Sequence, residues 1–218
     1  VVLDNFYDPE LKPVKIKLDP SLNAANNAAK YFKEYKKACV ARQTLGRLIK
    51  ADGEETEYLL NVEDSIKRCR TAADINEIKE ELRKEGYIKK SGKKKTAEPK
   101  IGFRPEEYVS EDGFRILVGR NNVENDRLTM KFAAKSDLWF HVKNAAGAHV
   151  ILITEGRQVS DSALLFAAGL AAKNSSLSSS QNVPVDYTFV KSVKKPNGAK
   201  AGMVIYENNK TLYVDPAK

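Results

Sequence analysis

Residues 137–143 alternate between apolar and polar side chains, as a strand of a half-buried sheet does, and a second strand-like run follows at 148–153. The pattern predicts two strands, over 138–143 and 148–153, joined by a turn in which Gly147 takes a positive φ. We expect the apolar side chains of the first strand to face a core. The opposite face would then gather four side chains with useful chemistry, namely Asp137, Trp139, His141 and Lys143.

This polar face supports two interpretations. It is either part of a core, with Trp139 half-buried and the histidines hydrogen-bonded, or a recognition surface where a ring for stacking lies beside cationic groups. In the register that we expect, Lys143 pairs with Ala148, which places His149 on the other face of the hairpin from His141. A shift of one residue would reverse that arrangement.

Apolar spacings of three and four residues predict helices in the first part of the chain, after a short N-terminal hairpin over 1–18. We expect one helix over 20–49, a tip at 51–53, and returning helices over 54–70 and 74–84. At a rise of 1.5 Å per residue the outgoing helix would be about 45 Å long. Residues 19–88 are therefore predicted to form an antiparallel helical hairpin, a coiled-coil arm.

The two legs of this hairpin differ in charge. The returning leg begins with acidic residues, whereas the outgoing leg carries basic residues against a single Glu34. The basic residues are Lys30, Lys33, Lys36, Lys37, Arg42, Arg47 and Lys50. These charges either pair across the seam between the legs or allow the arm to contact a distant partner.

The remainder of the chain predicts a second domain. Residues 89–100 are basic and poor in apolar side chains, so we interpret them as a linker. Residues 101–218 show several short strand patterns and two helical ones, the second of which begins at Ser160. The sequence thus predicts an α+β fold, in which the helical hairpin joins a mixed, mainly antiparallel β-sheet domain with two helices.

The first helix of this domain follows a short polar run. Arg120, Asn121 and Asn122 come directly after Gly119, and one of the two asparagines would cap the helix. Free N–H groups at a helix N-terminus attract anions, so the run is either ordinary turn chemistry or an anion-binding site.

The composition favours an anionic partner. The formal net charge is +8 and the pI is about 9.3, which suits nucleic acid or an anionic membrane surface. No apolar run approaches the length of a membrane-spanning helix. The chain starts with Val rather than Met and has no signal peptide, so we expect a piece of a longer protein. Cys39 and Cys69 lack CxxC spacing and are interpreted as free thiols of a cytosolic protein.

The motifs of common enzyme classes are absent from the sequence, including the phosphate loop, the dinucleotide fingerprint, the nucleophile elbow and HExxH. We therefore predict that the chain is not an enzyme and needs neither cofactor nor metal. The alternative is a metal-dependent hydrolase that would use Asp137, His141 and His149.

Five stretches of the chain closely resemble the C-terminal half of the NFACT family. They are DPSLNAANNAAKYFKEYKK (19–37), NEIKEELRKEGYI (76–88), GRNN…ND (119–126), DLWFHVKNAAGAHV (137–150) and VDYTFVKSVKKPNGAKAGMVIY (185–206). The resemblance covers nearly the whole chain, in the family's order. It implies a coiled-coil middle region followed by an RNA-binding domain over 101–218. One departure is Ala148, where the family commonly has Ser.

Bacterial members of this family include ribosome-quality-control factors, and many are labelled fibronectin-binding proteins. The former bind a large ribosomal subunit obstructed by peptidyl-tRNA, hold tRNA there and support untemplated alanine tailing of the stalled chain. The resemblance thus implies a cytoplasmic, ribosome-associated and non-catalytic RNA-binding part, with the large ribosomal subunit and tRNA as partners. The alternative that the label suggests is a surface adhesin that binds fibronectin.

The resemblance and the residue chemistry together suggest an RNA-binding set. Trp139 would stack an unpaired base, His141 and Lys143 would meet phosphate or a 2′-OH, and Asp137 would orient His141 or Arg120. The complete set is Arg120, Asn121, Asn122, Asn125, Asp137, Trp139, His141, Lys143, His149, Lys194, Lys195 and Lys200.

Overall fold

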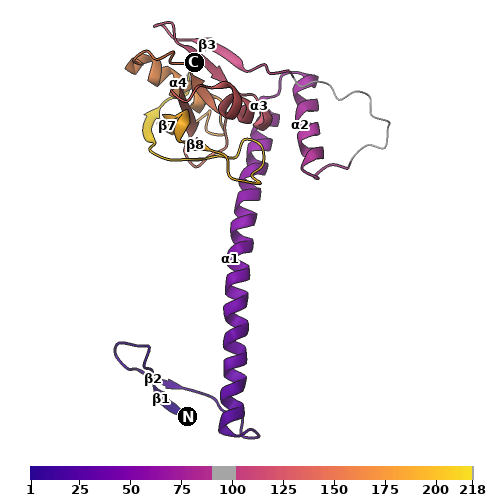
Figure 1. The fold of residues 1–218 in the computed structure, drawn as a ribbon, viewed down its shortest axis with the longest axis vertical. Helices are drawn as coiled ribbons and strands as arrows, with labels where there is room; N and C mark the ends of the chain where they lie inside the picture. The colour runs from indigo at the N-terminus through magenta and orange to yellow at the C-terminus, as the bar shows by residue number, and fades with distance from the viewer. Residues whose placement is uncertain (90–101, 218) are drawn as a thin grey trace. The chain divides into compact units, whose positions relative to one another are not determined.

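The computed structural model describes residues 1–89 and 102–217, so the predicted linker, apart from Lys89, lies outside the described residues. The chain divides into two compact units, Val1–Glu54 and Glu55–Lys218. Helix α1, Ala24–Arg68, is continuous across this division. Figure 1 gives the labels of the elements.

The first unit begins with two short paired strands. β1 (Val2–Asp4) and β2 (Pro13–Lys15) are antiparallel, as expected for residues 1–18. A loop then leads into α1, which begins at Ala24 rather than at the predicted residue 20. The buried Asn27 accounts for this later start of the helix. Its side-chain oxygen accepts a hydrogen bond of 2.8 Å from the N–H of Asp19, which holds the loop before α1 against the helix.

The predicted tip at 51–53 is wrong, because α1 passes through these residues without a break. Gly53 costs a helix interior only about 1 kcal/mol, and good helix-forming residues surround it. The chain turns back at 69–71, where Thr71 caps α2 (Ala72–Lys84) in a capping box with Asp74. The antiparallel hairpin therefore consists of the last turns of α1 and of α2, and it is shorter than predicted.

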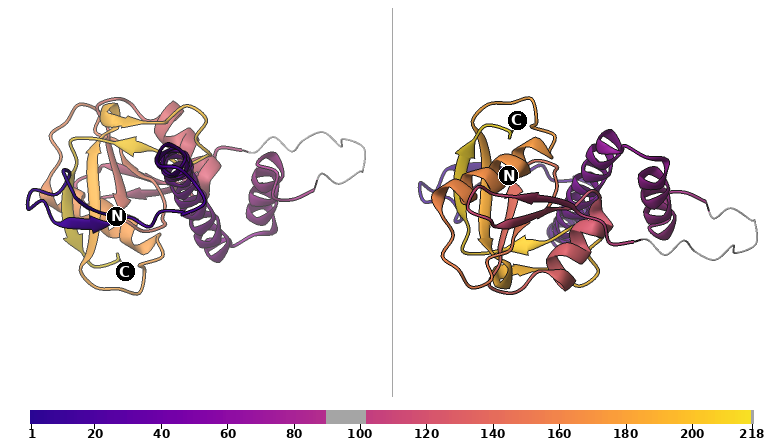
Figure 2. Two further views of the ribbon diagram at one scale, coloured as in Figure 1. Left: turned by 90° about the horizontal axis from the view of Figure 1, so that it is seen from below. Right: turned by 90° about the horizontal axis from the view of Figure 1, so that it is seen from above.

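A small core holds these two helices together. Tyr58 and Val62 of α1 pack against Ile78 of α2, and the Tyr58 hydroxyl donates a hydrogen bond of 2.9 Å to the Glu81 carboxylate. Both views of Figure 2 show α2 beside α1. The C-terminal turns of α1 thus belong to the second unit.

The second unit is built around one sheet of six strands in the order β10-β7-β5-β6-β4-β3, in which all neighbours are antiparallel. The predicted α+β class is confirmed. The strands are β3 (Glu106–Val109), β4 (Arg115–Val118), β5 (Leu138–Val142), β6 (Val150–Leu152), β7 (Val183–Phe189) and β10 (Lys210–Val214).

Helix α4 (Asp161–Lys173) covers one face of this sheet (Figure 1). Ser160 caps it as predicted, by accepting a hydrogen bond from the N–H of Ala163. Small side chains such as Ala167 allow the helix to lie close to Phe140 and Val150 of the sheet. We call this side the α4 face.

A second core covers the opposite face. There Trp139 and Ile151 of the sheet pack against Leu128 and Val193. Leu128 belongs to the single π-helical turn η1 (Leu128–Phe132), which directly follows α3 (Asn122–Arg127). Val193 belongs to β8 (Val193–Lys194), which pairs with β9 (Ile205–Tyr206) and follows the 3-10 turn η2 (Val190–Ser192). We call this side the α3 face.

The register of the central hairpin differs from the predicted one by one residue. Phe140 pairs with Val150, so that His141 and His149 lie on the same face, with ring centroids 5.5 Å apart. The positive φ of the connection falls on Asn144, at 54°, and not on Gly147. The connection is therefore longer than a tight turn, and β6 starts later than expected.

Gly147 is required for a different reason. It pairs with Ser175 in an isolated bridge, and a Cβ at position 147 would lie 2.9 Å from Val142 Cγ2 and from Ser175 Cβ. Such distances are too short for a real side chain. The glycine thus allows close packing of the connection against the chain that follows α4.

Candidate nucleic-acid interface

The predicted stacking ring, Trp139, is fully enclosed. Its exposed fraction is 0%, and Leu128, Val193 and Tyr206 of the α3 face cover it. The His141 ring stacks on it at 5.7 Å, and the His149 ring contacts it edge-on at 5.3 Å. A base cannot reach the indole in this arrangement, so the interpretation as a core is correct and that as an exposed platform is wrong.

The two histidines lie beside a small cavity of about 110 Å³ that Glu57, Asn61 and Tyr206 also line. His149 is buried and His141 is partly buried. Burial lowers the pKa of His141 to about 4 and that of His149 well below its ordinary value. His149 is also fixed by a contact of 2.8 Å between Nδ1 and the Thr129 hydroxyl. Both imidazoles are thus neutral at pH 7 and do not offer charge to phosphate.

The sequence suggested that Asp137 orients His141 or Arg120, but it contacts neither side chain through a hydrogen bond in the described residues. Its carboxylate accepts hydrogen bonds of 2.8 Å from the N–H of Ala134 and 2.9 Å from the N–H of Thr154. The side chain therefore holds together the chain segments at the start of β5 and the end of β6. The set of Asp137 and the two histidines is not assembled, and among the described residues no group of His, Cys, Asp and Glu could hold a metal ion.

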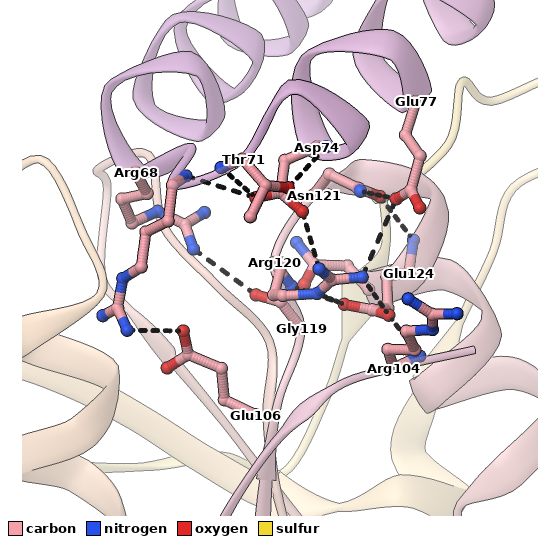
Figure 3. Close-up of polar contacts among 12 residues, drawn as sticks. Arg68, Thr71, Asp74, Glu77, Arg104, Glu106, Gly119, Arg120, Asn121 and Glu124 are labelled. Carbon is pink, nitrogen blue, oxygen red and sulfur yellow. Dashed lines mark hydrogen bonds and ion pairs between the residues drawn. The ribbon is translucent and has the colours of Figure 1, made fainter. Parts of the chain in front are cut away.

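Arg120, the predicted anion ligand, is surrounded by carboxylates (Figure 3). It donates to Asp74 Oδ1 at 2.7 Å and to Glu124 Oε2 at 3.1 Å, and its Nη2 lies 3.8 Å from Glu77. Its side chain is 24% exposed. The guanidinium thus links α2 to the start of α3, and its charge is used inside the protein.

The titration behaviour of this cluster agrees with that role. Burial opposes ionisation of Asp74, but hydrogen bonds from Thr71 and the backbone of Arg70, together with the charge of Arg120, outweigh it and lower the Asp74 pKa. Burial likewise opposes the charge on Arg120, and the bonds to Glu124 outweigh it and raise the Arg120 pKa. The ionised forms are therefore the stable ones.

The three predicted asparagines are buried, and two of them serve the same junction. Asn121 caps α3 by accepting from the N–H of Glu124, and its amide donates to Glu77 at 2.9 Å. Asn122 donates to the carboxylate of Glu81 at 3.1 Å. Asn125 accepts a hydrogen bond of 3.1 Å from the N–H of His149. Burial raises the pKa of Glu81, and the amide of Asn122 and the hydroxyl of Tyr58 partly offset this effect.

The predicted lysines differ in accessibility. Lys143 lies 3.7 Å from Asp186, and Lys195 is bonded to Asp126 at 2.8 Å. Lys200 lies over the rings of Tyr58 and Tyr87 at 4.5 and 4.7 Å. Lys194 is exposed. Within the predicted set, Lys194 thus remains the cation best placed to meet an RNA backbone.

Helix α1 adds a separate cationic surface in the first unit. The seven basic residues between 30 and 50 are all exposed. Two of them form weak local ion pairs, Lys30 with Asp19 at 3.7 Å and Lys50 with Glu54 at 3.9 Å. The ammonium of Lys36 lies 4.5 Å from the centre of the Phe32 ring. Because α1 is continuous, the proposed pairing of charges between an outgoing and a returning leg does not occur within these residues.

One exposed aromatic side chain that lies beside a cation was not among the predicted site residues. Phe189 ends β7 with 46% of its surface exposed, and the ammonium of Lys191 lies 5.1 Å from the centre of its ring. The signal was present in the alternation of β7, where Tyr187 and Phe189 share a face. The alternation predicts the shared face but not that α4 leaves Phe189 uncovered.

The fold and its matches define the class of protein. Residues 1–100 match the family model described as NFACT N-terminal and middle domains, and residues 104–208 match that of the NFACT protein RNA binding domain. The α+β unit with its two-sided sheet is thus of the RNA-binding-domain class. The chain belongs to the NFACT family.

Individual relatives support this family assignment. The chain is 40% identical over 219 residues to the "Rqc2 homolog RqcH" of Streptococcus suis, covering 100% of this chain and 38% of that protein. It is 37% identical to the protein of the same name in Bacillus subtilis, covering 97% and 37%. The solved C-terminal part of the fibronectin/fibrinogen-binding protein from Streptococcus suis is similar with a TM-score of 0.79 and 39% identity, covering 90% of this chain and 78% of that one. The chain spans about 38% of the length of the first of these curated relatives.

Proposed function

We propose that this chain is the non-catalytic RNA-binding part of a ribosome-associated quality-control factor. The factor would bind obstructed large ribosomal subunits and tRNA in the cytoplasm and support alanine tailing of stalled nascent chains, with peptidyl transfer left to the ribosome. The observation that carries the proposal is the match of residues 104–208 to the NFACT protein RNA binding domain. Identities of 37–40% to proteins named Rqc2 homolog RqcH support the ribosomal context.

The charge of the chain is consistent with this role. The formal net charge is +8, and exposed cations are concentrated on α1, where basic residues occur between 30 and 50. Each phosphate that a cation neutralises releases counterions, which makes such binding strongly dependent on salt. None of the helices in the described residues combines the length and apolar character that crossing a bilayer requires.

Sedimentation of the full-length protein with ribosomal subunits tests the proposal. We expect co-sedimentation with large subunits at low ionic strength and its loss as salt rises. A variant with Lys33, Lys37 and Arg47 all changed to Glu should dissociate at lower salt. The matched control, Lys33→Arg with Lys37→Arg and Arg47→Lys, retains the charge and should behave as the wild type. A full-length protein that binds neither subunits nor tRNA at low salt would contradict the proposal.

One observation favours a second function. The solved relative is named a fibronectin/fibrinogen-binding protein, so a surface adhesin is the alternative. Surface biotinylation of intact cells separates the two, because an adhesin is labelled and a ribosomal factor is not. Direct titration of fibronectin onto the full-length protein completes the comparison.

A further inference from the structure

The α4 face of the sheet has an open groove beside the start of α4. Its volume is about 450 Å³, and it extends from the loop before α4 to β7 and β10. The register explains its floor, because Leu138 lies opposite Phe189 and Lys210 lies opposite Tyr187. Directly opposite residues of antiparallel strands share a face. Helix α4 covers the neighbouring part of this face and leaves these side chains at its edge.

Aromatic rings form one side of the groove. Phe189 is 46% exposed at its rim. Tyr187 is partly buried and stacks on Phe140, with ring centroids 5.4 Å apart and an angle of 15° between the planes. The Tyr187 ring is thus held firmly by the core, while Phe189 next to it offers a ring face to an incoming group.

Cations lie along the groove. Lys210 and Arg157 line it, and Lys191 lies over Phe189. The Arg157 guanidinium lies 4.1 Å from the centre of the Phe114 ring and donates to the Gly113 carbonyl at 3.4 Å. Among the described residues, the lining includes no carboxylate, and its other polar groups are uncharged amides and hydroxyls. Glu155 lies beside the groove and pairs with Arg157 at 3.7 Å, but both side chains are largely exposed, so this pair is weak.

We propose that this groove binds an unpaired nucleotide of single-stranded RNA, with the base stacked on Phe189 and the phosphate near Lys210 and Arg157. Aromatic side chains stack bases of single strands, and a cationic rim follows the backbone. The absence of carboxylates among the described lining residues favours an anionic ligand over a basic peptide. A volume of about 450 Å³ lies within the usual range of small-ligand sites. The inference rests on the proposed RNA-binding function and assigns it a site.

The test measures binding of a fluorescein-labelled oligouridine of 12 nucleotides to the full-length protein, by fluorescence anisotropy at constant salt. Loss of one stacked base lowers affinity by about 5- to 150-fold, so Phe189→Ala should weaken binding by at least fivefold. Phe189→Tyr keeps the ring and should bind within about twofold of the wild type. The matched control is Tyr213→Ala, which removes an exposed aromatic side chain of β10 on the opposite face of the sheet.

Two further measurements examine where the base and the phosphate lie in the groove. Phe189→Trp places an indole at the rim, whose emission should be quenched on adding oligouridine by more than the emission of the wild-type protein is. Lys210→Ala should reduce the slope of log affinity against log salt by about 0.7, which corresponds to one phosphate contact on a single strand.

The outcomes separate the groove from the general function. Equal oligouridine affinities of Phe189→Ala and wild type would overturn the proposal that the groove binds a nucleotide, while leaving RNA binding in place. An equal loss of affinity in Phe189→Tyr and Phe189→Ala would do the same. Binding of tRNA without any binding of oligouridine would also overturn the groove. A wild-type protein that binds neither RNA would overturn both the groove and the proposed function.

Discussion

Two aromatic residues on neighbouring strands of the sheet differ in their exposure to solvent. Trp139 of β5 points to the α3 face and is fully buried under Leu128 and Tyr206. Phe189 of β7 points to the α4 face, beyond the part that α4 covers, and remains exposed. Alternation along a strand therefore fixes which face of the sheet a side chain takes. Access to that face depends on elements far away in the sequence.

The cations show the same difference. Arg120 is enclosed by carboxylates of α2 and α3, which come from segments on both sides of it in the sequence. Lys210 lies in a groove whose described lining has no carboxylate. A guanidinium or ammonium therefore marks an anion site only where the folded chain has not already neutralised it.

The largest expected effect is on stability, at Trp139. Trp139→Ala should lower the free energy of unfolding by roughly 3–5 kcal/mol, because it removes a large side chain from a closed core. Urea unfolding followed by circular dichroism measures this loss. Trp139→Phe should cost less, about 1–2 kcal/mol, because the indole Nε1–H has no hydrogen-bond partner in the described residues to lose. A loss below about 1 kcal/mol for Trp139→Ala would mean that the α3 face is open in solution.

Local signals in the sequence predicted much of the fold. Alternation gave the strands of the central hairpin, and Ser160 and Asn121 cap helices as their side chains suggested. The α+β class follows from these local patterns. The tip at 51–53 failed because a lone Gly weakens a helix without ending it.

The register and the site depended on distant contacts. The connection after β5 is set by the approach of Gly147 to Ser175, a residue that the local pattern does not include. Likewise, Trp139 is covered by Tyr206, 67 positions further along the chain (206 − 139). Residue types along 137–150 predicted the chemistry available there, but they could not predict that later segments close over it.

The second prediction concerns acid stability of the α3 face. The pKa of His141 is about 4 in the folded protein, against about 6.5 in an unfolded chain. The unfolded state therefore binds more protons between these values, so stability is complete above pH 6.5 and is lost as the pH falls toward 4. We expect His141 to contribute about 2 kcal/mol of the loss between pH 7 and pH 5. Urea unfolding at a series of pH values measures it.

His141→Gln serves as the control for this pH dependence. Asp186, Glu57 and His149 surround His141 and are present in both proteins, so the difference between the two isolates the one imidazole. The variant should lose about 2 kcal/mol less than the wild type between pH 7 and pH 5. Parallel curves for the two proteins would show that His141 is solvated and that the α3 face admits water.

The smallest change in the free energy of unfolding is expected on substitution of Phe189. Because its ring is largely exposed, Phe189→Ala should change the free energy of unfolding by less than about 1 kcal/mol, mostly through lost strand preference and its contact with Leu138. Tyr213→Ala on the other face should cost a similar amount. Urea midpoints of both variants and the wild type measure the difference. A loss above about 2 kcal/mol at Phe189 alone would place its ring in the core, and the contrast between the two faces would then disappear.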